Sequence, residues 1–220
     1  MRSMVLIAAL GLLGGVPSAA SAQKAELARY QRAAIRGLGR LEEPAAFEQA
    51  FKGKAPEEAR ASAAQLAARG VVRLSAEDLK HRAELVLDFT GRANTKTCGK
   101  WSRGSASGED VIGMITQLDS VALDDWVDLS LRATVAEVRQ TQASFAGTQA
   151  DIAKMFEHLS TAMTEKESER FHTVMAKFEK ASPKDACWFG RQLYISALAL
   201  KPEERNHALR TLAWLETQSS

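Results

Sequence analysis

The chain has few of the residues that cofactor chemistry and β-structure require. Of its 220 residues, 6% are aromatic and two are cysteines, Cys98 and Cys187. The two cysteines form neither a C-x-x-C nor a C-x-x-C-H sequence, which excludes a thioredoxin-type redox motif and a covalently attached haem. They also lack the neighbouring ligands of a zinc site. We therefore predict no cofactor.

Signatures of common enzyme classes are also missing. There is no G-x-S-x-G sequence, and no cluster of Ser, His and Asp suggests a nucleophile. The glycine-rich segment around Gly91 and Gly99 lacks the spacing of a phosphate-binding loop, because too many residues separate the two glycines. No pair of carboxylates stands out from the 27 acidic residues, as glycoside hydrolysis would require.

The charge is close to balanced. The formal net charge is +2, from 29 basic and 27 acidic residues. A nucleic-acid-binding protein needs a basic excess to displace counterions, so we expect no nucleic-acid partner. The same balance argues against electrostatic docking on anionic lipid.

The first 22 residues have the pattern of a secretory signal peptide. Arg2 gives a positive start, and an apolar run follows over residues 4–16. Residues 20–22 (Ala-Ser-Ala) supply the small side chains that a signal peptidase recognises, which predicts cleavage after Ala22. The apolar run is shorter than the ~20 residues that span a bilayer, so we expect no stable membrane anchor. The mature chain, residues 23–220, is then a single all-helical domain, periplasmic or secreted.

If the chain is exported, its two cysteines lie in an oxidising compartment, and this favours a disulfide. An even number of cysteines in an oxidising compartment indicates a disulfide, so we predict a bond between Cys98 and Cys187. The chain has no N-x-S/T glycosylation sequence and is rich in alanine, which indicates a bacterial export product.

Alanine is frequent and strand-type alternation is rare, which favours helices. Start and stop signals divide the mature chain into about eight helices, among them helices over residues 24–37, 75–89 and 121–146. N-cap signals are clear at three positions where an acid follows three residues on: Ser75, Thr164 and Ser182.

The segment that follows Ser182 is predicted to be the centre of the fold. From Leu193 to Leu200 it is apolar almost all round, and such a helix is buried by its neighbours. We therefore predict an all-α, irregular or orthogonal bundle around a buried helix 183–200. A short α-solenoid is the alternative, and no repeat of fixed period supports it.

A basic interruption, predicted to be a loop, runs from Gly91 to Gly108 and contains no acidic residue. Arg and Trp are favoured at interface hot spots, and a long loop in a compact domain is often functional. The candidate contacts with an acidic partner are Arg92, Lys96, Lys100, Trp101 and Arg103. We favour instead a loop that its charges keep soluble, with Trp101 packed onto the disulfide and Trp188.

Two Glu-x-x-His segments are candidates for a metal site: Glu169 with His172, and Glu204 with His207. The spacing puts each pair one helical turn apart, as in the di-iron site of ferritin-like bundles. The helical phase argues against this site, because in the last helix Leu209 and Leu212 point inward while His207 lies outside that face. We therefore predict no metal, and solvated histidines.

Three functions remain open after these exclusions. We expect an exported, non-enzymatic factor that binds another envelope protein, such as an inhibitor, an immunity-type factor or an envelope chaperone. One alternative is a cell-wall hydrolase, which requires a cleft with two carboxylates. The other is a carrier of a metal or small ligand, which requires both Glu-x-x-His segments at one cavity.

Overall fold

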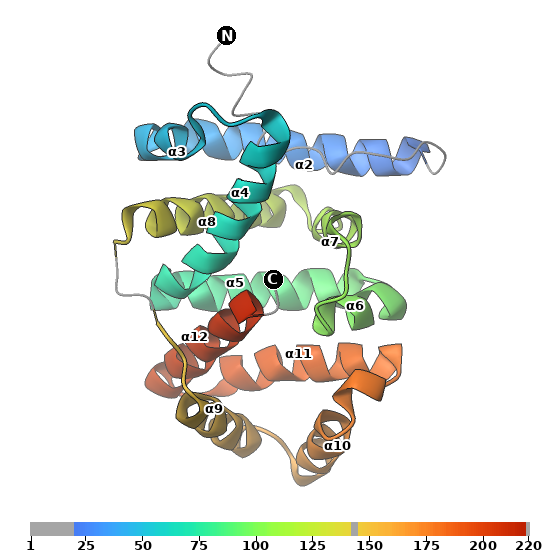
Figure 1. Cartoon of the computed structure of the whole chain (residues 1–220). Coiled ribbons are helices and arrows are strands. Elements are labelled where there is room, and N and C mark those ends of the chain that lie inside the picture. The colour runs from blue at the N-terminus through green and yellow to red at the C-terminus, as the bar shows by residue number, and fades with distance from the viewer. Residues whose placement is uncertain (1–19, 142–144, 219–220) are drawn as a thin grey trace. The chain divides into compact units, whose positions relative to one another are not determined.

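The computed structural model describes residues 20–141 and 145–218. Within them the chain has eleven α-helices, two short 3-10 helices and no strand (Figure 1). The all-α class is confirmed. The described residues form more helices than predicted, since the start and stop signals indicate about eight. Residues 1–19, which hold most of the predicted signal peptide, lie outside the described residues.

The chain divides into two compact units. Unit 1 takes its residues from Met1–Leu74 and Ile115–Ser144, and unit 2 takes them from Ser75–Met114 and Phe145–Ser220. Each unit therefore combines two separate stretches of the sequence. The single-domain organisation predicted for residues 23–220 stays a prediction.

Unit 1 is built around helix α8. Its elements are α2 (Ala20–Arg40), α3 (Pro44–Phe51), α4 (Pro56–Gly70), η1 (Val71–Arg73) and α8 (Ser120–Arg139). All four other elements contact α8, and α4 crosses it (Figure 1). At the crossing, a Cβ atom on Gly70 would collide with the backbone carbonyl of Ala133, so only glycine allows this approach. Leu123, Val127 and Leu131 of α8 are buried in the core.

Ion pairs between arginine and aspartate side chains also connect α2 to α8. Arg36 donates two hydrogen bonds to Asp124, at 3.0 and 2.6 Å, and Arg40 donates in the same way to Asp128, at 3.1 and 2.9 Å. Such exposed pairs each contribute about 0.2–1 kcal/mol. Helix α8 ends at Arg139, because Gln140 adopts the left-handed conformation with φ 51°. The prediction of a helix to residue 146 is therefore wrong at its C-terminal end.

Unit 2 is built around helix α11. Its elements are α5 (Ala76–Arg92), α6 (Thr95–Ser102), α7 (Gly108–Ile115), α9 (Gln149–Thr161), α10 (Glu165–Met175), η2 (Phe178–Lys180), α11 (Pro183–Ala199) and α12 (Pro202–Gln218). Helix α11 contacts α5, α6, α9, α10 and α12, which agrees with its predicted central place. Its buried side chains include Phe189 and Tyr194, while Ile195 is 44% exposed on the remaining face.

Local sequence determines where these helices start. Ser75, Thr164 and Ser182 each accept a hydrogen bond from the backbone N–H three residues on, so all three predicted N-caps are confirmed. In α10 the bond is reciprocal, because the Glu167 carboxylate also accepts from the Thr164 backbone N–H at 2.9 Å. Each cap satisfies amide groups that have no partner inside the helix.

Candidate functional site

The segment predicted to be a basic loop contains a helix, so the loop prediction over residues 91–108 is wrong. Helix α5 continues to Arg92, and α6 begins directly after Asn94, whose side chain accepts from the Thr97 N–H at 2.9 Å. Gly99 lies in the middle of this helix, and because glycine has no side chain, α11 can approach α6 closely at this position. A Cβ atom there would lie 2.5 Å from the backbone oxygen of Pro183.

A covalent bond joins the same two helices. Cys98 of α6 and Cys187 of α11 form the predicted disulfide, with sulfur atoms 1.99 Å apart and Cα atoms 5.1 Å apart. Gly190, three residues after Cys187, leaves no space for a Cβ atom beside Ser102 of α6. The disulfide and the two close glycine contacts thus hold α6 firmly against α11.

The basic side chains of this segment mostly bond within unit 2. Arg92 donates to the Asp88 carboxylate at 2.6 Å, and Lys100 donates to Asp110 at 3.0 Å. Arg103 donates to the backbone carbonyl of Ala181 at 3.1 Å. Lys96 is exposed to solvent. The predicted partner-binding role of these residues stays a prediction.

The ring contacts of Trp101 are with Phe89 and Tyr194 and not with the expected Trp188, while its packing onto the disulfide stays a prediction. Its ring meets Phe89 edge-on at 5.7 Å and lies 6.2 Å from the ring of Tyr194. Trp188, the expected contact, instead lies under the Arg170 guanidinium, 4.1 Å from the ring centroid. Trp101 is half-buried, and one side of it faces a pocket.

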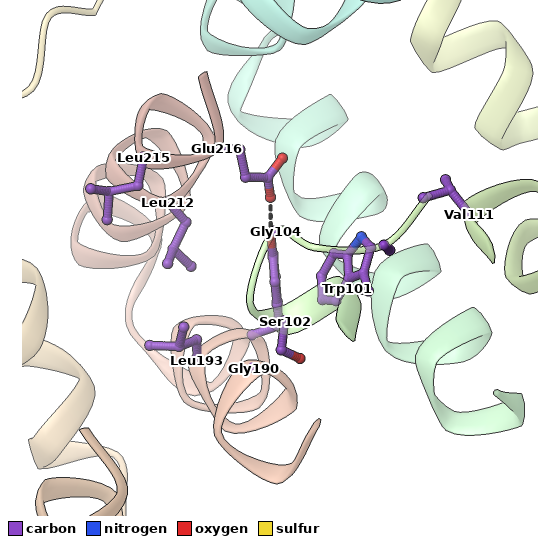
Figure 2. A pocket seen from close by; sticks show the side chains of 11 residues that line it. Trp101, Ser102, Gly104, Val111, Gly190, Leu193, Leu212, Leu215 and Glu216 are labelled. Atoms are coloured by element: carbon purple, nitrogen blue, oxygen red, sulfur yellow. Dashed lines mark hydrogen bonds between the residues drawn. The ribbon is translucent and has the colours of Figure 1, made fainter. Parts of the chain in front are cut away.

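This pocket has a volume of about 490 Å³ and lies entirely within unit 2. Ligand sites commonly have volumes of about 300–1,000 Å³ and mainly apolar walls. Figure 2 shows Trp101 and Val111 opposite Leu212 and Leu215. The complete lining consists of Trp101, Ser102, Gly104, Ala106, Val111, Gly190, Leu193, Tyr194, Leu212, Leu215 and Glu216.

Two polar residues of the wall, Tyr194 and Glu216, form a bonded triad with Arg82, which lies outside the lining. Arg82 of α5 donates to both Glu216 oxygens, at 3.3 and 2.6 Å, and the Tyr194 hydroxyl donates to the same carboxylate. Burial raises the pKa of Tyr194, and the Glu216 charge raises it further, so the phenol stays protonated. Burial is the largest single influence on the pKa of Arg82 and lowers it, but the charge of Glu216, the hydrogen bond to it and the interaction with Tyr194 together raise the pKa by more, so the guanidinium stays charged.

The sequence pattern indicates one residue of this site, Trp101, and gives no specific signal for Arg82 or Glu216. These two residues are 134 positions apart in the sequence and carry no local motif. The one available signal was a carboxylate at the end of the last amphipathic helix, which a solvated surface would also produce.

The Glu-x-x-His residues lie on α10 and α12. His207 Nε2 lies 3.1 Å from the Asp151 carboxylate of α9, and His158 Nδ1 lies 4.0 Å from Glu204. Hydrogen bonds from Thr148, followed by the bond with His207, lower the pKa of Asp151 to about 2. In the part of the chain that the structure describes, no group of three or more His, Cys, Asp or Glu side chains is placed to hold a metal, either here or at Glu169 and His172.

No protein-family model, no curated protein and no solved structure matches this chain. Among the described helices, none is both long and apolar enough to cross a membrane. The function therefore has to be inferred from the pocket of unit 2 and its surroundings.

Proposed function

We propose that this chain is an exported, non-enzymatic binding protein, and that the pocket of unit 2 is its ligand-binding site. The observation that carries the proposal is a pocket of about 490 Å³ whose walls are mainly apolar and fixed in place. The α6 wall is tied to α11 by the disulfide, and the triad links α5, α11 and α12. A pre-formed site of this kind loses little conformational entropy when a ligand binds.

Two further observations support binding over hydrolysis. Glu216 is the one carboxylate among the described residues that line the pocket, and it is already paired with Arg82. Glycoside hydrolysis needs two carboxylates, one of them an acid with a raised pKa. For export, the support is the pattern of residues 1–22 together with a disulfide, which persists in oxidising compartments. The envelope protein expected as a partner stays a prediction.

A fluorescent apolar probe tests the proposal on the full chain. N-phenyl-1-naphthylamine is uncharged and becomes brighter in an apolar site. We expect saturable binding that Ala106→Phe weakens at least tenfold, because the added ring occupies the pocket. Ala162→Phe is the matched control, since this alanine is also half-buried in unit 2 but lies outside the pocket lining.

Circular dichroism first establishes that both variants are folded. Saturable binding that is lost in the first variant and kept in the second supports the pocket as the site. Absence of saturable binding, or equal binding by both variants, would overturn the proposal.

A further inference from the structure

We infer that the pocket selects uncharged, largely apolar small molecules and discriminates against both anions and cations of the same size. This inference rests on the proposed function and specifies its ligand class. It comes from three properties of the wall: its charge balance, its engaged hydroxyl groups, and its aromatic and aliphatic faces.

The one charge at the wall is compensated by a residue behind the wall. Glu216 is the one charged side chain among the described lining residues, and the guanidinium of Arg82 lies 2.6 Å from its carboxylate. A cationic ligand would approach Glu216 but would also meet the charge of Arg82 behind it. An anionic ligand would meet the carboxylate first. Since a charge moved from water into an apolar site without a partner loses much of its solvation free energy, neither charge type gains by entering.

The hydroxyl groups at the wall also offer little to a polar ligand. The Tyr194 hydroxyl donates its proton to Glu216, and the Ser102 hydroxyl donates to the Cys98 carbonyl at 3.0 Å. Both donors are thus committed to bonds within the chain. Binding free energy must come mainly from apolar contact.

The apolar faces suit a ring or a short aliphatic chain. Trp101 presents part of an indole ring opposite the side chains of Leu212 and Leu215 (Figure 2). Aromatic pairs contribute to affinity beyond the burial of their area. An uncharged aromatic molecule placed against Trp101 would use this wall fully.

Three naphthalene compounds that differ in charge test the inference by displacing N-phenyl-1-naphthylamine. These compounds are 1-naphthylmethanol, 1-naphthoate and 1-naphthylmethylammonium. We expect the uncharged alcohol to displace the probe at a concentration at least tenfold lower than either ion. Equal or better displacement by either ion, or no displacement by the alcohol, would overturn the inference.

Two variants should shift the selectivity in opposite directions. Glu216→Gln removes the negative charge at the wall and keeps the Arg82 charge behind it, so 1-naphthoate should gain at least tenfold in affinity relative to the alcohol. Arg82→Met removes the positive charge behind the wall and keeps the Glu216 carboxylate, and 1-naphthylmethylammonium should gain by a similar factor. If either folded variant keeps the selectivity of the original protein, the charge-balance argument is wrong.

Failure of the two proposals can be told apart. If the probe itself does not bind, the proposed function fails. If the probe binds and Ala106→Phe abolishes binding, but the three compounds compete equally, the proposed function stands and the inference about ligand charge fails.

Discussion

The Arg82–Glu216 pair should make a large and measurable contribution to the stability of unit 2. The side chain of Arg82 is 14% exposed and that of Glu216 is 35% exposed. Two unit charges ~4 Å apart attract by about 4 kcal/mol at an effective dielectric constant of about 20. Desolvation of both groups and the partial exposure of Glu216 reduce this value, so we expect a coupling free energy of about 2 kcal/mol.

A double-mutant cycle measures this coupling in the free energy of unfolding. Glu216→Gln should destabilise by about 3 kcal/mol, because it removes the carboxylate that the largely buried Arg82 guanidinium pairs with. Arg82→Met should destabilise by about 2 kcal/mol, because the more exposed carboxylate can regain water. The double variant should then also lose about 3 kcal/mol, less than the two single losses together. Urea unfolding followed by circular dichroism gives each value.

The exposed pair formed by Asp88 and Arg92 is the control in the same unit. Its residues are four apart in α5, so we expect a coupling of about 0.3–0.5 kcal/mol. Backbone amide exchange in unit 2 establishes that each measured change belongs to this unit. A coupling below about 0.5 kcal/mol for Arg82 and Glu216 would refute the reasoning, because the pair would then behave as a screened surface pair.

Three further predictions concern pH, packing and the disulfide. Because the folded state lowers the pKa of Asp151 to about 2 from 3.8, its contribution to stability is complete above about pH 4 and is lost as the pH falls to 2. The melting temperatures of the original protein and of Asp151→Asn should therefore converge over this range, and a constant difference would contradict the assignment. Gly70→Ala should destabilise unit 1 by more than about 2 kcal/mol through collision with the α8 backbone, whereas Gly39→Ala, with open space around it, should be neutral or stabilising by up to about 1 kcal/mol. Urea unfolding compares the two, and equal effects would exclude the collision. Replacing Cys98 and Cys187 by serine should lower the unfolding free energy by at most about 4–5 kcal/mol, measured in the same way and compared with the oxidised protein. No change at all would mean that the bond constrains nothing.

The features that local chemistry controls could be predicted from the sequence. The N-caps at Ser75, Thr164 and Ser182 involve residues only three apart, so a short window contains the complete interaction. The disulfide followed from the predicted compartment and an even cysteine count. The central place of α11 followed from its nearly continuous apolar surface.

The wrong loop prediction and the site residues that the sequence does not indicate have a common physical cause. Helix α6 contains Gly99, which has a poor helix propensity, and the close approach of α11 that favours glycine there is a tertiary contact. Likewise, the partners Arg82 and Glu216 are brought together by the packing of α5 and α12. The candidate pocket depends on these long-range contacts, so only Trp101 could be selected beforehand.

The interleaved order of the two units restricts how the chain can be divided. Helix α8 belongs to unit 1, yet the chain reaches it only after α5, α6 and α7 of unit 2, and it then returns to unit 2 for α9–α12. No single cut releases either unit intact. During synthesis from the N-terminus, α5 and α6 must wait for α11 before their main partner in unit 2 exists. To make an isolated unit 2, the segment Ile115–Ser144, which contains α8, would have to be deleted and the two stretches of unit 2 joined by a designed linker.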